Sequence, residues 1–144
     1  MKLDEKGYKA LHDREGLRLK PYLDTRGIPT IAMGNTFYEN LSKVTMLDKP
    51  ITKIEAERLG KVIADRFAKQ VGALVKSNVN QNQFNALVSI AYNIGINGFK
   101  NSSFLKLVNK NPNDPKIKEA IMLWTKNKEL IGRRKSEVSQ YFTK

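Results

Sequence analysis

Residues 14–31 read REGLRLKPYLDTRGIPTI, and within them a helical pattern gives way to short strands and turns. Gly16 directly follows Glu15, which predicts a helix end because glycine readily adopts the left-handed conformation that closes helices. The segment from Asp24 to Gly27 has the composition of a tight turn, and residues able to form strands lie on both sides of it. We therefore expect a helix up to this stretch and a small antiparallel sheet beginning within it.

Helical patterns precede and follow this stretch. A first helix is predicted over about residues 4–14, with Asp4 as its N-cap. Thr52 and Glu55 form a capping box ahead of apolar residues at helical spacing, so a long helix is expected over about residues 53–76. Further apolar stripes predict helices over about residues 84–94, 102–109, 117–124 and 132–141.

The order of these elements predicts the α+β class, in which a small N-terminal lobe with an antiparallel β-sheet is joined by a long helix to a larger α-helical C-terminal lobe. We expect residues 1–144 to form one domain. The sheet lobe would cover about residues 15–52 and the linking helix about residues 53–76. The helical lobe would cover about residues 77–144, together with the N-terminal helix.

Composition limits the chemistry that the chain can perform. There are 26 Lys and Arg residues against 14 Asp and Glu residues, a formal net charge of +12, which attracts polyanions such as nucleic acid, acidic lipid or an anionic cell wall. Cysteine is absent and His12 is the only histidine, which excludes disulfides, thiol catalysis and a histidine metal cluster. The sequence shows neither a secretory signal nor a transmembrane run, so we expect a soluble protein without its own export signal.

Two carboxyl groups and a hydroxyl group lie close together along the chain, at Glu15, Asp24 and Thr30. Glycoside hydrolysis requires an acid that protonates the leaving oxygen and a second carboxylate that activates or positions water. The spacing alone also fits a simpler interpretation, in which Glu15 is a solvated residue at a helix end and Asp24 forms a turn.

The order Glu-Gly, Tyr-x-Asp, Gly and Thr-Ile resembles the active-site segment of the phage-type lysozymes, glycoside hydrolase family 24. The chain matches it without insertion at Glu15-Gly16, Tyr22-Leu23-Asp24, Gly27 and Thr30-Ile31. Residues 83–95 are similar to the family's helix along the cleft, and residues 98–103 to the turn after it. Trp124 and residues 131–137 are similar to the C-terminal signature, in which an Arg-Arg pair precedes a Glu. The resemblance therefore covers most of the chain.

The resemblance implies a role for each matched residue. Glu15 would be the general acid on the glycosidic oxygen, Asp24 the base or electrostatic partner of the attacking water, and Thr30 the residue that positions this water. It implies inversion at the sugar carbon, for which the two carboxyl groups lie roughly 6.5–9.5 Å apart. No metal and no cofactor are expected. The positions matched near the sugar chain are Thr36, Tyr92, Asn93 and Ser102, although Tyr92 equally suits the core.

The chain departs from the family directly after the matched segment. The family usually shows Gly-x-Gly-His, where this chain has Ala32-Met33-Gly34-Asn35. Loss of the first glycine is expected to affect the backbone near the cleft, while Asn35 can still form hydrogen bonds in place of histidine. We expect His12 to be a surface or packing residue and Trp124 to be a core residue. The pair at Arg133–Arg134 could bind wall carboxylates or hold Glu15 by a buried charge-assisted bond, and we favour the structural role.

The resemblance implies an endolysin-type muramidase that hydrolyses the β-1,4 bond between N-acetylmuramic acid and N-acetylglucosamine in bacterial peptidoglycan, leading to host cell lysis. The alternatives are a lytic transglycosylase, a virion-associated lysozyme, and a non-catalytic module that binds wall or nucleic acid. Since Asp24 and Thr30 suit a reaction with a positioned water, they favour hydrolysis.

The same resemblance implies where the protein acts. We expect a monomer whose partner is bacterial peptidoglycan, with no nucleic-acid partner, no stable membrane association and no separate wall-binding domain. It would remain in the host cytoplasm, without a signal peptide, until a holin pore releases it to the periplasm and cell wall.

Overall fold

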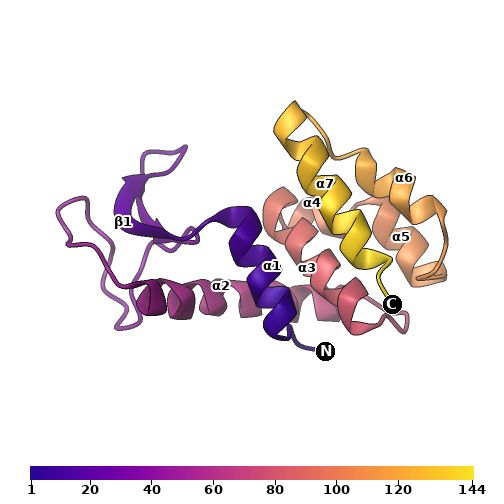
Figure 1. Cartoon of the computed structure of the whole chain (residues 1–144), viewed down its shortest axis with the longest axis horizontal. Helices are drawn as coiled ribbons and strands as arrows, with labels where there is room; N and C mark the ends of the chain where they lie inside the picture. The colour runs from indigo at the N-terminus through magenta and orange to yellow at the C-terminus, as the bar shows by residue number, and fades with distance from the viewer. The chain divides into compact units, whose positions relative to one another are not determined.

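The computed structural model describes all residues, 1–144, and contains seven α-helices and one two-stranded β-sheet (Figure 1). In chain order the elements are α1 (Glu5–Glu15), β1 (Arg18–Leu23), β2 (Pro29–Ala32), α2 (Lys53–Leu74), α3 (Gln81–Ile94), α4 (Ile96–Lys100), α5 (Ser103–Lys110), α6 (Lys116–Met122) and α7 (Lys128–Tyr141). The α+β prediction is confirmed. The chain divides into two compact units, the sheet unit Tyr8–Asp65 and the helical unit made of Met1–Gly7 with Arg66–Lys144.

Both ends of α1 are closed by the residues that the sequence indicates. The Gly7 N–H donates to the Asp4 carboxylate at 2.9 Å, so Asp4 caps the helix. At the other end, Gly16 has a φ of +73° and its N–H donates to the His12 carbonyl at 2.8 Å. A left-handed glycine after the last helical residue is a common helix stop, and it explains why α1 ends at Glu15.

The sheet of the sheet unit is one antiparallel hairpin. Tyr22 on β1 lies opposite Thr30 on β2, and the register shifts between Tyr22 and Arg18. Pro21 lies in the shifted segment, where it has no N–H to donate to a ladder. The hairpin therefore brings the end of β1 and the start of β2 together, next to the turn that carries Asp24.

The chain after β2 forms turns, where the sequence predicted that the sheet lobe continues to about residue 52. Only isolated bridges occur there, including one between Phe37 and Lys43. Asp48 organises the following loop, because its carboxylate accepts hydrogen bonds from the N–H and hydroxyl of Thr45 and from the Tyr38 hydroxyl. A side chain thus provides the hydrogen bonds that a longer strand ladder would have supplied.

The first half of α2 packs on the hairpin and completes the core of the sheet unit. The Glu55 N–H donates to the Thr52 hydroxyl at 3.1 Å at the start of the helix, and α2 ends at Leu74, two residues before the predicted end. Burial of each large aliphatic side chain stabilises the fold by about 1.5–3 kcal/mol. The buried cluster consists of Ile31, Ala32, Val44, Ala56 and Leu59, with Leu17, Tyr38 and Ile51 packed against it.

The helical unit is built around α3, which packs along α7 (Figure 1). Asn80 and Gln83 form a capping box at the start of α3, and Gly95 ends this helix. The predicted start of the last helix near residue 132 was wrong. Asn127 accepts a hydrogen bond from the Leu130 N–H and starts α7 four residues earlier, which leaves Gly132 inside the helix. A capping bond outweighs the modest cost of an interior glycine.

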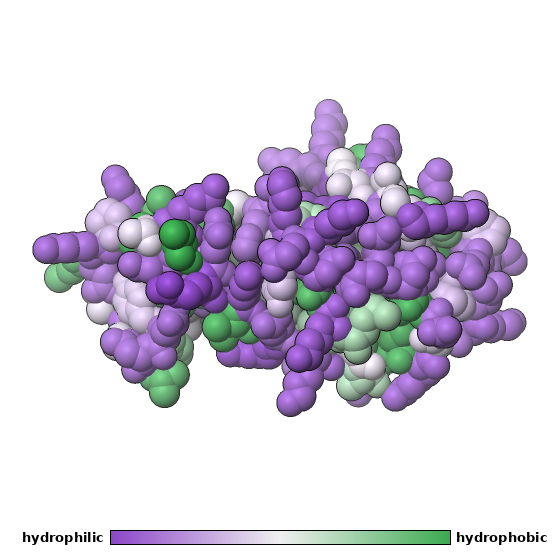
Figure 2. Space-filling model, turned by 60° about the horizontal axis from the view of Figure 1, so that its bottom comes forward, coloured by the Kyte–Doolittle hydropathy of each residue, from purple (hydrophilic) through white to green (hydrophobic).

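Hydrophilic residues cover most of the face of the molecule shown in Figure 2, with apolar residues scattered among them. Such scattered apolar groups are ordinary on protein surfaces. None of the helices combines the length and the apolar content that crossing a membrane requires.

Candidate active site

Glu15 is the last residue of α1 and is half-buried. The chain turns sharply after it, because Gly16 adopts the left-handed conformation before β1 begins. Apart from Gly16 and its two chain neighbours, no atom lies within 4 Å of the position that a Cβ on Gly16 would occupy, so it is the backbone conformation that favours glycine here. This turn holds the Glu15 carboxyl at the junction between helix and sheet.

Asp24 occupies the first position of the hairpin turn, where its backbone carbonyl accepts the Gly27 N–H at 2.9 Å. Its Oδ1 accepts the N–H groups of Arg26 and Ile28 at 2.8 and 2.9 Å, and its Oδ2 lies 3.6 Å from the Arg26 guanidinium. The Ile28 N–H is the main cause of a lowered pKa at Asp24, and the Arg26 N–H and charge lower it further. Asp24 is therefore held ionised, with Oδ2 available to accept a proton.

Thr30 is buried, and its hydroxyl donates to the Ile28 carbonyl at 2.7 Å. Asp24 and Thr30 therefore bind opposite ends of the same residue, one its N–H and the other its C=O. Because the hydroxyl proton of Thr30 is already donated, its oxygen faces any further partner as an acceptor. This arrangement fixes the two side chains relative to each other.

The charges of both Glu15 and Asp24 act on the phenol of Tyr22. Burial raises the pKa of its phenol, the Arg18 charge lowers it, and the negative charges of Asp24 and Glu15 raise it further. The Arg18 guanidinium lies 4.6 Å from the centre of the Tyr22 ring, within range for a cation–π contact. Tyr22 thus lies within electrostatic range of both Glu15 and Asp24, and both charges raise the pKa of its phenol.

Ala32 and Asn35 take the positions where the sequence departs from the expected pattern. Ala32 is buried with a φ of +59°, a conformation that costs a non-glycine residue roughly 1–2 kcal/mol. It thus keeps a backbone conformation that glycine would favour. The Asn35 amide donates to the Leu59 carbonyl at 3.0 Å and accepts the Met33 N–H at 3.3 Å, which confirms that it can form buried hydrogen bonds.

The helical unit contains a pocket of about 600 Å³, and two of the predicted sugar-binding residues, Asn93 and Ser102, line it. Trp124 also lines it and is half-buried, which corrects the expectation that it is a core residue. Gly98 permits the close approach of the Trp124 ring, which would lie 3.2 Å from a Cβ at that position. The other lining residues are Ile94, Asn101, Ser103, Leu123, Lys126, Leu130 and Arg134.

The four predicted sugar-binding residues differ in how far their side chains are already engaged. The Ser102 hydroxyl caps α5, accepting the Leu105 N–H at 3.1 Å and donating to the Phe99 carbonyl at 2.7 Å. Asn93 is exposed, and its Oδ1 accepts a hydrogen bond from Arg134.

The other two lie in different units. The half-buried ring of Tyr92 packs on Phe67, with ring centres 5.1 Å apart, in the helical unit. Thr36 belongs to the sheet unit, where its carbonyl accepts the Val44 N–H at 2.9 Å. Glu15, Asp24 and Thr30 lie in the sheet unit with Thr36, whereas Tyr92, Asn93 and Ser102 lie in the helical unit.

The Arg133–Arg134 pair serves a buried polar network in the helical unit. Both guanidinium groups bond the buried Glu137 carboxylate, and Arg134 also donates to the Trp124 carbonyl at 3.0 Å. Ser89 adds a hydrogen bond from its hydroxyl to Glu137 at 2.5 Å. The pair thus has a structural role at Glu137, since a buried carboxylate is stable only when it is well paired. The predicted bond to Glu15 stays a prediction.

Two features of the site were not predicted from the sequence. One is the pair of hydrogen bonds by which Ile28 holds Asp24 and Thr30, and the other is the effect of the Glu15 and Asp24 charges on the pKa of Tyr22. Asp side chains commonly accept the N–H group two residues on, which predicts the bond from Arg26 to Asp24 but not the bond from Ile28. Across the structure, no group of three or more His, Asp or Glu side chains is arranged to hold a metal ion.

The phage lysozyme family model matches residues 12–137, a span that contains every site residue discussed above. The chain belongs to the phage lysozyme family. The endolysin of Salmonella phage P22 is 34% identical to it over 141 residues, 95% of each chain. Two solved structures each align over 99% of both chains, the P22 lysozyme with a TM-score of 0.89 at 33% identity and the muramidase domain of SpmX from Asticaccaulis excentricus with a TM-score of 0.83 at 30% identity.

These similarities confirm the lysozyme-like fold that the sequence predicted, and they identify this phage lysozyme as an enzyme. They agree with the local geometry, because the family match begins at His12 and so includes the end of α1 and the hairpin. The catalytic and sugar-binding roles of individual residues remain predictions.

Proposed function

We propose that this phage lysozyme is an endolysin-type muramidase that hydrolyses the β-1,4 bond between N-acetylmuramic acid and N-acetylglucosamine with inversion. Two hydrogen bonds support this proposal most directly: Asp24 accepts the Ile28 N–H, and Thr30 donates to the Ile28 carbonyl, in the hairpin that follows the helix ending at Glu15. Endolysin and muramidase relatives support peptidoglycan as the substrate.

In the proposed reaction, Glu15 donates a proton to the glycosidic oxygen as the bond to the sugar carbon breaks. The attacking water donates one hydrogen to Asp24 Oδ2 and the other to Thr30 Oγ1, which can only accept because its own proton binds the Ile28 carbonyl. The lone pair of the water then faces the sugar carbon. As the new bond forms, Asp24 takes one proton, and Glu15 is left as the carboxylate.

The same proposal assigns sugar binding to Thr36, Tyr92, Asn93 and Ser102. Asn93 is the best supported of these, because it is exposed at the rim of the larger pocket and its amide nitrogen is directed by the bond that Arg134 makes to its oxygen. Ser102 supports the pocket mainly as a helix cap.

Clearing of chloroform-permeabilised Gram-negative cells tests the catalytic acid. We expect Glu15→Gln to reduce the rate by about 10²–10⁴-fold, the usual contribution of a general acid, with an unchanged melting temperature. Glu57→Gln removes an acidic group on α2 and is the matched control, with full activity expected. Equal clearing by wild type and Glu15→Gln would contradict the assignment.

A lytic transglycosylase would cut the same bond without a positioned water and leave an anhydro sugar. Asp24 and Thr30 favour hydrolysis over this reaction. Mass spectrometry of the released muropeptides separates the two, because hydrolysis adds the mass of one water to each cleaved bond and transglycosylation adds none. If the wild type clears no cells, the non-catalytic binding module becomes the better account.

We also propose that the enzyme acts as a monomer, does not bind nucleic acid, and reaches the wall through a holin pore rather than as a virion-attached lysozyme. Expression in a host without phage genes tests this route. The cells should remain intact until a holin is co-expressed or chloroform is added, and lysis without either would contradict the holin route.

A further inference from the structure

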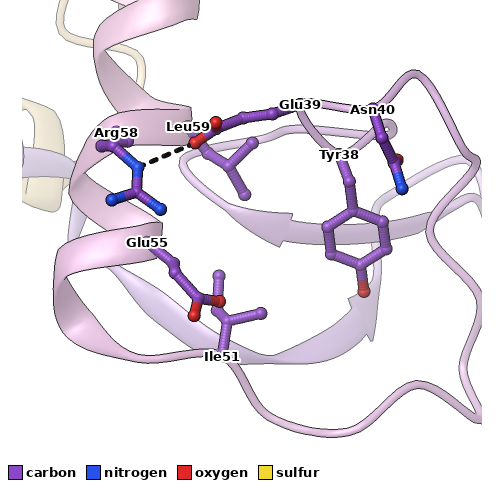
Figure 3. A pocket seen from close by; sticks show the side chains of 7 residues that line it. All are labelled: Tyr38, Glu39, Asn40, Ile51, Glu55, Arg58 and Leu59. Atoms are coloured by element: carbon purple, nitrogen blue, oxygen red, sulfur yellow. Dashed lines mark hydrogen bonds and ion pairs between the residues drawn. The ribbon is translucent and has the colours of Figure 1, made fainter.

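A second pocket, of about 300 Å³, lies in the sheet unit between the chain around Tyr38 and the first turns of α2 (Figure 3). Ile51 and Leu59 supply apolar surface, and polar groups surround them. None of the proposed catalytic or sugar-binding residues lines this pocket. Its lining residues are Tyr38, Glu39, Asn40, Ile51, Glu55, Arg58 and Leu59.

Glu55 points to a binding role for the pocket. The sequence motif predicts that its carboxylate folds back to the Thr52 N–H, but only the other half of the capping box forms, from the Glu55 N–H to the Thr52 hydroxyl. The carboxylate instead lines the pocket beside Ile51 (Figure 3). It forms no hydrogen bond or ion pair in the structure, so its charge is available to a ligand.

Arg58 supplies the opposite charge. Its Nε donates to the Glu39 carboxylate at 3.0 Å, which fixes the direction of the guanidinium (Figure 3). Its two terminal nitrogens have no protein partner, and they can bind a carboxylate in the forked geometry that arginine favours. The pocket therefore presents a carboxylate and a guanidinium around a small apolar surface.

We propose that this pocket binds the zwitterionic amino-acid end of a peptidoglycan stem peptide, with its ammonium at Glu55 and its carboxylate at Arg58. The inference rests on the proposed function, because peptidoglycan carries short peptides on its muramic acid residues. A diaminopimelate residue in such a peptide has a free ammonium and a free carboxylate on one carbon, joined to an aliphatic chain that fits against Ile51 and Leu59. Peptide binding adds a second attachment to the wall and raises the local concentration of glycan.

The first test is a titration of the full chain with the tripeptide L-Ala-γ-D-Glu-meso-diaminopimelate, followed by NMR chemical shifts. We expect shifts around Glu55 and Arg58, and a Kd about fivefold higher for Glu55→Gln and for Arg58→Gln, a loss typical of one partly exposed charge-assisted contact. Glu57→Gln, which changes a neighbouring carboxylate that does not line the pocket, should bind as wild type does.

A peptide with lysine in place of diaminopimelate tests the role of Arg58. Lysine keeps the ammonium but lacks the second carboxylate, so wild type should bind it about fivefold more weakly, while Arg58→Gln should bind both peptides equally. Absence of shifts at the pocket with either peptide would overturn the proposal, as would shifts that Glu55→Gln and Arg58→Gln leave unchanged.

Kinetics on two substrates separate this inference from the proposed function. Glu55→Gln should raise KM about fivefold on peptide-bearing glycan strands and leave KM unchanged on strands whose peptides an amidase has removed. An equal change on both substrates would overturn the peptide pocket. Failure of the wild type to cut either substrate would contradict the muramidase itself, whereas normal cleavage without tripeptide binding would contradict the pocket alone.

Discussion

Ile28 contributes to the proposed site through its peptide group. Its N–H holds Asp24 and its C=O holds the Thr30 hydroxyl, so one residue orients both groups that would bind water. Both bonds are made before any substrate arrives. Groups that are already oriented need no rearrangement during the reaction, which is the main way in which enzymes stabilise developing charge.

Ala32 offers a test of backbone strain next to this site. Ala32→Gly removes the cost of a left-handed alanine, roughly 1–2 kcal/mol. It also removes a buried methyl worth about 0.8 kcal/mol, and the two effects oppose one another. We expect a change in the free energy of unfolding of less than about 1 kcal/mol. Ala32→Val should lose about 2 kcal/mol or more, because a branched side chain is poorly tolerated at positive φ and in a packed core.

Urea denaturation of both variants measures these changes. A large loss in Ala32→Gly would show that the methyl matters more than the strain, and an unchanged Ala32→Val would contradict the left-handed conformation.

At this scale the sequence predicted the identity of the candidate catalytic residues but not how they are held. The pattern around Glu15, Asp24 and Thr30 could be recognised because it matches the family's active-site segment without insertion, although the spacing alone would not have decided it. The position of Trp124 at the pocket rim could not be predicted from the sequence, since the exposure of a side chain depends on how helices distant in the sequence pack together. The sequence also did not predict that the Glu55 carboxylate is free. The capping-box motif predicted a bond from the Thr52 N–H to this carboxylate, and the structure does not form it.

The place where a helix ends determines where a site residue such as Glu15 lies. Gly16 stops α1 directly after Glu15, whereas Gly132 lies inside α7 and stops nothing. Apart from the neighbouring chain and, at Gly132, the backbone of its own helix, no atom lies within 4 Å of the position that a Cβ would occupy at either glycine. The two glycines differ in backbone conformation. Substitution by alanine should therefore have opposite effects at the two positions.

Gly16→Ala should destabilise the protein by about 1–2 kcal/mol, because alanine resists the left-handed conformation. Gly132→Ala should stabilise it by about 0.5–1 kcal/mol, because glycine lowers helix stability. Thermal unfolding followed by circular dichroism measures both. The same sign for the two substitutions would contradict these assignments.

Element boundaries were predictable where the stop or start signal is local. Asp4, Gly16 and Thr52 act as the sequence indicates. The start of α7 was misplaced because Gly132 resembles a boundary, while the true signal is the Asn127 cap. The length of the strands was not predictable, because turn-rich sequence after β2 does not reveal whether strands or side chains satisfy the backbone.

Charge is distributed unequally between the two units of the molecule. Lys and Arg outnumber Asp and Glu by 16 to 6 in the helical unit, and by 10 to 8 in the sheet unit. The helical unit thus accounts for most of the net charge of +12. A positive field of this kind raises the local concentration of an anionic polymer without taking part in bond cleavage.

Salt should therefore weaken binding to the wall and leave the chemical step unchanged. The Debye length falls from about 10 Å at 0.1 M salt to about 3 Å at 1 M, so we expect KM on purified wall to rise about tenfold over this range. The value of kcat should stay constant. Turbidity assays at fixed pH measure both, and a KM independent of salt would show that the net charge does not assist binding.

The configuration of the newly formed sugar end reports directly on the side from which water attacks. Proton NMR of a defined glycan strand, recorded within the first minutes of cleavage, distinguishes the two anomers before they interconvert. Water held by Asp24 and Thr30 opposite Glu15 predicts that the β-linked muramic acid is released first as the α-anomer. Initial release of the β-anomer, or of an anhydro sugar, would contradict this account.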